Sequence, residues 1–194
     1  MRHSAMKDWA YIVSLLLSPH LYGVVVLAII CAWKGYGPVT FLEAGTLLSL
    51  APLLPILVDR WRGKTDLFIS ERRKRTKYFA ATAAIYAAAA AIYYSRGQTL
   101  LYLLFATYLV ETLLHMAVNT RWKISIHSAG IAGPTTFLVL TLGSWFAALY
   151  LLLLPVYAAR KKLRAHTDAQ LLAGALLAAL STVVVVKILT SYTA

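Results

Sequence analysis

The chain alternates long apolar runs with short basic segments. The apolar runs are rich in Ala, Leu and Val and cover residues 9–33, 39–57, 78–94, 99–118, 131–157 and 171–189. Most of them approach or exceed the roughly 20 residues that an α-helix needs to cross about 30 Å of hydrocarbon. Because backbone groups inside lipid must be paired within their own segment, such runs predict helices. The pattern predicts an all-α fold, a polytopic membrane helical bundle.

Composition strengthens this prediction. The 194 residues are 60% hydrophobic and only 13% charged, which is too apolar for a soluble domain of this size. We therefore expect one integral membrane domain over residues 1–194. The first run is longer than the apolar core of a signal peptide, so we expect it to be retained as a helix.

The positive charge is concentrated in a few places. The formal net charge is +12, and all cations except Lys34, Arg96 and Lys187 lie in the N-terminal tail, at Arg2 and Lys7, or in segments 60–77, 119–130 and 159–170. A nucleic-acid partner is disfavoured, because basic loops between apolar segments are what retains them on the cytoplasmic side of a membrane. We expect a multi-pass protein of the cell membrane with these three loops in the cytoplasm.

The run at 131–157 tests that topology. His127 and Arg160 are separated by 32 residues, and one straight helix of that length would span about 48 Å, more than a bilayer requires. Gly143 and Ser144 form a turn-prone pair in its middle. We expect a short helical hairpin, which gives six to seven transmembrane segments, with the amino terminus inside and the carboxyl terminus outside.

The loop at 60–77 reads RWRGKTDLFISERRKRTK. It can serve purely as a topological anchor that also touches anionic lipid heads. Alternatively, Arg72 and Arg75, three residues apart on a helix, face one direction and bind phosphate oxygens with their guanidinium groups. Asp66 and Glu71 can orient these arginines, and two carboxylates without His or Cys partners predict no metal site.

The segment WKISIH places Lys123, Ser125 and His127 at alternating positions, so in an extended stretch their side chains project the same way. Gly130, Gly133 and Pro134 follow at the expected mouth of a helix, where free N–H groups favour an anion. A structural hydrogen-bonding role for His127 is the alternative.

The last basic segment contains Arg160, then His166 and, one helical turn later, Gln170. Arginine can hold a phosphate while the imidazole faces phosphorus. The side chain of Gln170 can accept the proton on one ring nitrogen and leave the other nitrogen nucleophilic.

These residues carry a resemblance to a known family. Ser125-Ile126-His127 and Arg160-x5-His166-x3-Gln170 resemble the second and third motifs of the type 2 phosphatidic acid phosphatase superfamily, which includes the vanadium haloperoxidases and reads P-S-G-H and S-R-x5-H-x3-D. Ile124, Ile126, Ala159 and Gln170 replace the proline, the glycine, the serine and the aspartate of those motifs. The first motif, K-x6-R-P, is absent, and Arg72 and Arg75 are the candidates for its role.

The resemblance implies a metal-independent phosphatase without a cofactor that acts on a lipid phosphate or diphosphate, of the phosphatidic acid or isoprenyl type. In this interpretation His166 attacks phosphorus and forms a phosphohistidine, while His127 protonates the leaving oxygen and then activates water. Residues of the three basic segments bind the phosphate oxygens: Arg160, Lys123, Ser125, Arg72 and Arg75.

Two further alternatives stay open. Gln170 and the missing first motif are also compatible with a non-catalytic lipid-binding or transport protein that retains the fold. Glu111 and His115, spaced i and i+4 on the fourth run, predict a neutralised side-chain pair inside the membrane rather than a metal site.

Overall fold

The structure is a computed structural model that describes residues 8–191, so Arg2 and Lys7 lie outside the described residues. The described residues form helices joined by loops, with no strand among them, which confirms the all-α prediction. The α-helices are α2 (Trp9–Leu16), α3 (Pro19–Lys34), α4 (Pro38–Gly45), α5 (Ala51–Trp61), α6 (Arg75–Ser95), α7 (Thr99–Asn119), α8 (Ile126–Thr141), α9 (Leu153–Lys162) and α10 (Asp168–Ser191). A π-helical segment, η1 (Thr46–Leu50), and two 3-10-helical segments, η2 (Arg72–Lys74) and η3 (Ser144–Leu152), complete the described fold.

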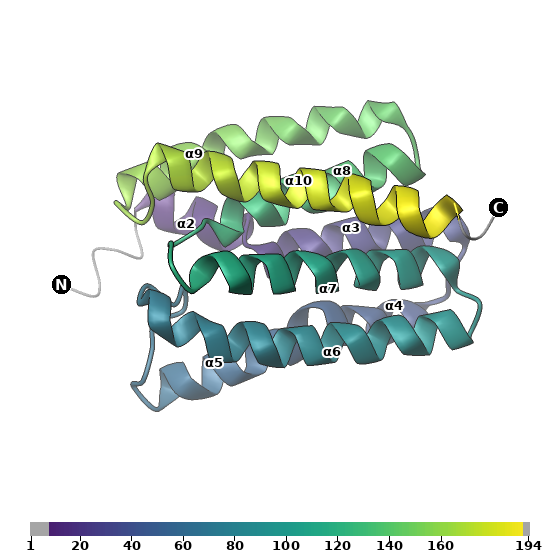
Figure 1. The fold of residues 1–194 in the computed structure, drawn as a ribbon, viewed down its shortest axis with the longest axis horizontal. Coiled ribbons are helices and arrows are strands. Elements are labelled where there is room, and N and C mark those ends of the chain that lie inside the picture. Colours follow the sequence, from purple (N-terminus) through teal and green to yellow (C-terminus); the bar gives the residue numbers. More distant parts are fainter. Residues whose placement is uncertain (1–7, 192–194) are drawn as a thin grey trace.

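Most helices run along the long axis of the molecule, as Figure 1 shows. The loops α5–α6, α7–α8 and α9–α10 lie at one end of the bundle, and the α6–α7 turn and the end of α10 lie at the other. We call the first end the basic end, because its loops at 62–71, 120–125 and 163–167 belong to the three basic segments. The fold thus gathers these segments, which are far apart in the sequence.

The first apolar run is divided rather than continuous. α2 and α3 are bent by 42° at the break between them, where the sequence analysis expected one helix. Proline disfavours helical geometry in the residue before it, and Ser18, just before Pro19, is extended with φ −68° and ψ 151°. The side chain of Ser18 accepts a hydrogen bond from the N–H of Leu21 and starts α3 as its N-cap.

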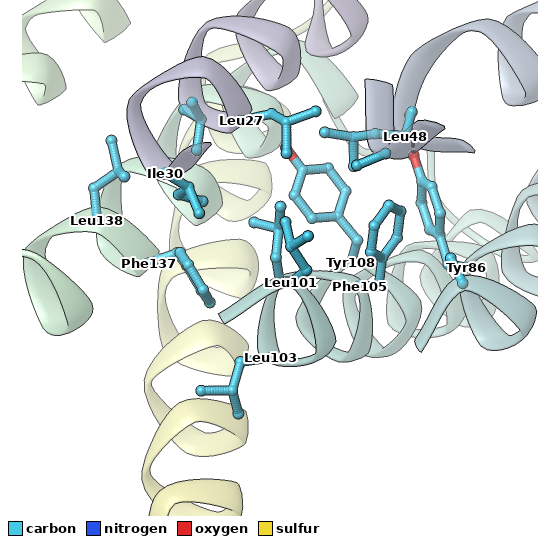
Figure 2. Packing of buried hydrophobic residues seen from close by; sticks show 14 of the residues in the cluster. Leu27, Ile30, Leu48, Tyr86, Leu101, Leu103, Phe105, Tyr108, Phe137 and Leu138 are labelled. Carbon is cyan, nitrogen blue, oxygen red and sulfur yellow. Dashed lines mark hydrogen bonds between the residues drawn. The ribbon is translucent and has the colours of Figure 1, made fainter. Parts of the chain in front are cut away.

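Prolines also shape the second run. The π-helical segment η1 precedes Pro52, which has no N–H to donate to the carbonyl of Leu48. The hydroxyl of Tyr86 donates to that carbonyl instead, at 2.9 Å. Figure 2 shows Tyr86 reaching from α6 towards Leu48. A side chain of one helix therefore satisfies a backbone group that proline leaves free in another.

The predicted break at Gly143 and Ser144 is present. α8 ends at Thr141, Gly143 has φ 141° and ψ 154°, and the 3-10 helix η3 begins at Ser144. η3 and α9 then pack back against α8. This hairpin returns α9, whose last turn carries Arg160, to the end of the bundle where α8 begins, as Figure 1 shows for the helix.

Within the described residues 8–191, three helical stretches are long and apolar enough to cross a membrane: Pro38–Trp61, Thr99–Asn119 and Asp168–Ser191. Counting the bent pair α2 and α3 as one span raises the number to four. These helices are compatible with a membrane protein, but six to seven crossings are not confirmed. α8 is too short, with 16 residues, and α6 starts with cations and is composed largely of Ala and Tyr.

The core lies between α3, α6, α7 and α8, and part of it is drawn in Figure 2. α7 packs against both α6 and α10, and α10 packs against α8. Tyr93 and Phe105 stack with their ring centroids 5.3 Å apart. This packing fixes the helices whose ends carry the candidate site.

Candidate active site

The start of α8 and the start of α10 are joined directly at the basic end. The N–H of Ser125 donates to the carbonyl of Gln170 at 3.2 Å. A Cβ at Gly174 would lie 2.3 Å from the carbonyl oxygen of Ser125, so only glycine permits this approach. The contact places the segment before His127 beside the segment that follows His166.

Gln170 fixes the tautomer of His166. The Oε1 atom of Gln170 accepts from the N–H of Thr167 at 3.2 Å and lies 3.1 Å from Nδ1 of His166. Because Oε1 can only accept, Nδ1 must carry the ring proton. Nε2 of His166 then has the free lone pair, and this atom is buried without a hydrogen-bond partner among residues 8–191.

The surroundings keep the His166 ring neutral. Burial lowers its pKa to about 3, an effect that the hydrogen bond to Gln170 opposes and the positive charges of Arg160, Arg75 and Lys123 strengthen. A nucleophilic nitrogen must be unprotonated. In the empty site, His166 therefore meets this requirement throughout the neutral pH range.

His127 lies in the first turn of α8 and is only 3% exposed. Its Nε2 atom is 3.1 Å from the backbone carbonyl of Ser14 in α2, and a carbonyl can only accept, so Nε2 carries the proton. Nδ1 of His127 is buried without a partner. His127 thus also presents one free ring nitrogen.

Two arginines are buried beside the histidines without a carboxylate. Arg160 is 3% exposed and Arg75 is 2% exposed, and neither forms an ion pair within residues 8–191. Arg75 donates to the carbonyls of Ile69 and Ile124, whereas Nε of Arg160 has no partner. Since a buried charge is costly unless it is paired, this arrangement favours an anion.

A cavity of about 650 Å³ opens next to Arg160 and Lys123. Its wall also includes Arg60 and Arg164, with Asp66 as an acidic residue. Burial lowers the pKa of Lys123, and the charges of Arg75 and Arg160 lower it further. We call this the basic cavity, and its charge suits a phosphate group.

A second cavity of about 320 Å³ extends between α3, α5, α6, α7 and α8. We call it the apolar cavity, because most of its lining side chains are aliphatic or aromatic, among them Leu53 and Phe79. Arg75 and His127 line it at the basic end. It therefore leads from the candidate site into the bundle.

Phe68 lines both cavities. Its ring centroid lies 5.4 Å from that of His127 and 5.0 Å from the guanidinium carbon of Arg160. Phe68 therefore separates the basic cavity from the apolar cavity and packs on two of the predicted site residues.

Comparison with known proteins gave no match. No family model, no curated protein and no solved structure is similar to this chain. The resemblance carried by the two motifs therefore remains a prediction. Within residues 8–191, no group of three or more His, Cys, Asp or Glu side chains could hold a metal ion.

Two predicted phosphate ligands have other partners. The sequence predicted an extended backbone from Lys123 to His127, but it ends at Ser125, the N-cap of α8. The hydroxyl of Ser125 accepts hydrogen bonds from the N–H and the hydroxyl of Ser128. Arg72 reaches the same segment as Arg75, but its guanidinium donates to the carbonyls of Asn119 and Thr120. Both side chains hold the loop in place.

The expectation for the glycines that follow His127 was wrong. Gly130 and Gly133 lie inside α8 rather than at its mouth. A Cβ at Gly130 would meet Pro19 at 2.7 Å, and one at Gly133 would meet Oε1 of Glu111 at 2.1 Å. These glycines allow close helix packing.

The predicted side-chain pair of Glu111 and His115 is not formed. Nδ1 of His115 lies 2.7 Å from the backbone carbonyl of Glu111, and the Glu111 carboxyl accepts from the hydroxyl of Thr182 on α10. At the spacing i and i+4, the His115 ring meets the backbone carbonyl of Glu111 instead of its carboxyl. The partner of that carboxyl, Thr182, comes from α10, and no local sequence pattern indicates it.

The sequence analysis missed Ser14 and Phe68. Ser14 is fully buried, and besides its carbonyl contact with His127 its hydroxyl lies 3.3 Å from Arg160. A serine inside an apolar run was the available signal for Ser14. Phe68 is an aromatic residue in a charged loop, and that contrast was its signal.

Proposed function

We propose that the protein is a membrane phosphatase that hydrolyses a lipid phosphate or diphosphate through a phosphohistidine intermediate. The observation that carries the proposal is the state of His166 within residues 8–191: Nδ1 is bound to Gln170, Nε2 has no hydrogen-bond partner, and the buried Arg160 beside it forms no ion pair. The two cavities support the substrate class, because the basic cavity suits a phosphate and the apolar cavity suits a lipid tail.

In the first step Nε2 of His166 attacks phosphorus, and the bond from phosphorus to the leaving oxygen breaks. A phosphate that enters as its monoanion first gives its proton to Nδ1 of His127. His127 then passes this proton to the leaving oxygen. Arg160, Arg75 and Lys123 stabilise the negative charge on the non-bridging oxygens.

In the second step Nδ1 of His127 takes a proton from water, and the resulting hydroxide attacks phosphorus. The bond from phosphorus to Nε2 breaks, and inorganic phosphate leaves with the proton that Nδ1 of His127 took, so both histidines are neutral again. Gln170 is neutral and leaves the positive charge on the phosphorylated ring, which makes His166 a good leaving group. We place the basic end at the cytoplasmic face of the cell membrane, since Lys and Arg in short loops are retained there.

The test is phosphate release from dioleoyl phosphatidic acid and from farnesyl diphosphate by purified protein in nanodiscs. We expect His166→Ala to lower the rate by more than about 10³-fold and Arg160→Ala by about 10²-fold or more. Arg96→Ala is the matched control, because Arg96 pairs with Glu43 on the surface at the opposite end of the bundle. An unchanged rate in the His166 variant would refute the mechanism.

A second candidate is lipid binding or transport without hydrolysis. It is favoured by the neutral side chain of Gln170. It is also favoured by the burial of the site, since the atoms of His166, His127 and Arg160 without a partner in residues 8–191 are all buried. Wild-type protein that binds these lipids and releases no phosphate would support this second function.

A further inference from the structure

His115 is a buried polar residue that the proposed reaction does not use. It lies on α7, is 3% exposed and lines the apolar cavity. Nε2 of His115 has no hydrogen-bond partner in the part of the chain that the structure describes. A buried polar atom without a partner costs stability, so its position on a cavity wall points to a ligand.

The partner of the other ring nitrogen defines what Nε2 can bind. Nδ1 lies 2.7 Å from the carbonyl oxygen of Glu111, which can only accept a hydrogen bond. Nδ1 therefore carries the proton, and Nε2 of the neutral ring is an acceptor. A group that binds Nε2 must then donate a hydrogen bond, as a hydroxyl or an amide N–H does and an ester carbonyl does not.

His115 lies at the depth in the bundle where a lipid group next to the phosphate would lie. His115 lies one helical turn, about 6 Å, before Asn119 on α7. Asn119 is at the level of the site, because its side chain donates to the carbonyl of Arg72. His127 and Arg75 line the same apolar cavity, so one lipid can reach His115 and the charged residues at once.

We propose that His115 forms a hydrogen-bond-accepting subsite that selects lipids with a free hydroxyl or amide N–H next to the phosphate. This inference rests on the proposed function, because that function gives the position of the phosphate. Within the lipid phosphates of the proposed function, it predicts tighter binding for those that retain a hydrogen-bond donor beside the head group.

The experiment measures binding and does not depend on hydrolysis. The probes are two phosphonate analogues of 1-oleoyl-glycerol 3-phosphate, one with the 2-hydroxyl and one without it, which cannot be hydrolysed at the phosphorus. Binding of each to the full chain in nanodiscs is measured by native mass spectrometry or calorimetry. We expect the hydroxyl compound to bind about 10-fold more tightly to the wild type, a difference of about 1.4 kcal/mol.

His115→Phe keeps a ring of similar size and removes the acceptor, so the two analogues should then bind equally. Tyr93→Phe is the control, because the Tyr93 hydroxyl is also buried and unpartnered but does not line the apolar cavity; this variant should keep the 10-fold preference. Equal binding of both analogues to the wild type, or binding of neither, would overturn the inference. Phosphate release in the separate hydrolysis assay reports on the proposed function by itself.

Discussion

Gln170 has two roles at once. Its side chain accepts from the N–H of Thr167 and from His166, and its own N–H donates to the hydroxyl of Thr167. Reciprocal bonds of this kind form a capping box, T-x-x-Q, at the start of α10. The residue that orients the His166 ring is therefore held by the helix that it caps.

Gln170→Glu should keep the capping box and the acceptor for Nδ1 of His166. The added negative charge should raise the pKa of His166 above its value of about 3, so the acid limb of the pH–rate profile should move to higher pH. Gln170→Ala should lose both contacts and lower the rate on the order of 10–100-fold. Phosphate release between pH 4 and pH 8 measures both effects, and identical pH profiles for the wild type and the glutamate variant would contradict the assignment of His166 as the nucleophile.

At this scale, residue spacing predicted the local contact and missed the distant ones. The spacing of His166 and Gln170 is that of one helical turn, so the sequence alone indicates that the two side chains meet. The partners of His127 and Arg160 lie on α2, more than a hundred residues away. No local pattern specifies such a partner, because tertiary packing decides it.

At the scale of elements, the breaks between helices follow proline and glycine. Pro19 ends the first helix early and Gly143 turns the hairpin, and both breaks have signals in the sequence. The bend of α2 against α3 and the close approach of α10 to Ser125 depend on which helices pack together. α2 packs against α9, and Lys162 of α9 forms an ion pair with Asp8 at the start of α2.

Gly174→Ala tests the contact between α10 and α8. The added methyl group would overlap the carbonyl of Ser125, so α10 must shift and the bond from Ser125 to Gln170 must lengthen. We expect a loss of about 1–3 kcal/mol in the free energy of unfolding together with a loss of phosphatase activity. Thermal unfolding of the detergent-solubilised protein measures the first effect.

Gly45→Ala is the matched control, because Gly45 is also helical and its added methyl group would meet Leu27 at an ordinary 3.6 Å. Replacing a helical glycine by alanine where space permits stabilises by up to about 1 kcal/mol. Equal destabilisation by the two substitutions would show that the close approach of α10 has no special importance.

At the scale of the whole molecule, charge placement is the dominant feature. The three basic segments meet at one end of the bundle, because a hairpin of two short arms replaces one long helix between the second segment and the third. The positions of Lys and Arg along the sequence were sufficient to predict that the three basic segments lie at the same end. The number of crossings could not be predicted equally well, because length and hydropathy do not distinguish a spanning helix from one that packs inside the bundle.

Cysteine labelling tests the topology in whole cells. In a Cys31→Ser background, Lys64→Cys, Arg121→Cys and Lys161→Cys place thiols at the basic end, and Ser95→Cys places one at the other end; all four positions are exposed. An impermeant maleimide should label only residue 95 from outside, and permeabilised cells should give labelling at all four. Outside labelling at residues 64, 121 and 161 would reverse the proposed orientation.

The hairpin and the contact of Ser125 with α10 also have a consequence for synthesis. His127, the turn at Gly143, Arg160 and His166 leave the ribosome in that order, and Gln170 and Gly174 follow them. The tautomer of His166 and the position of the segment before His127 are both fixed by α10. In the proposed mechanism, a nascent chain in which α10 is not yet in place therefore lacks an oriented nucleophile, so hydrolytic capacity would arise only when this helix has packed against α8.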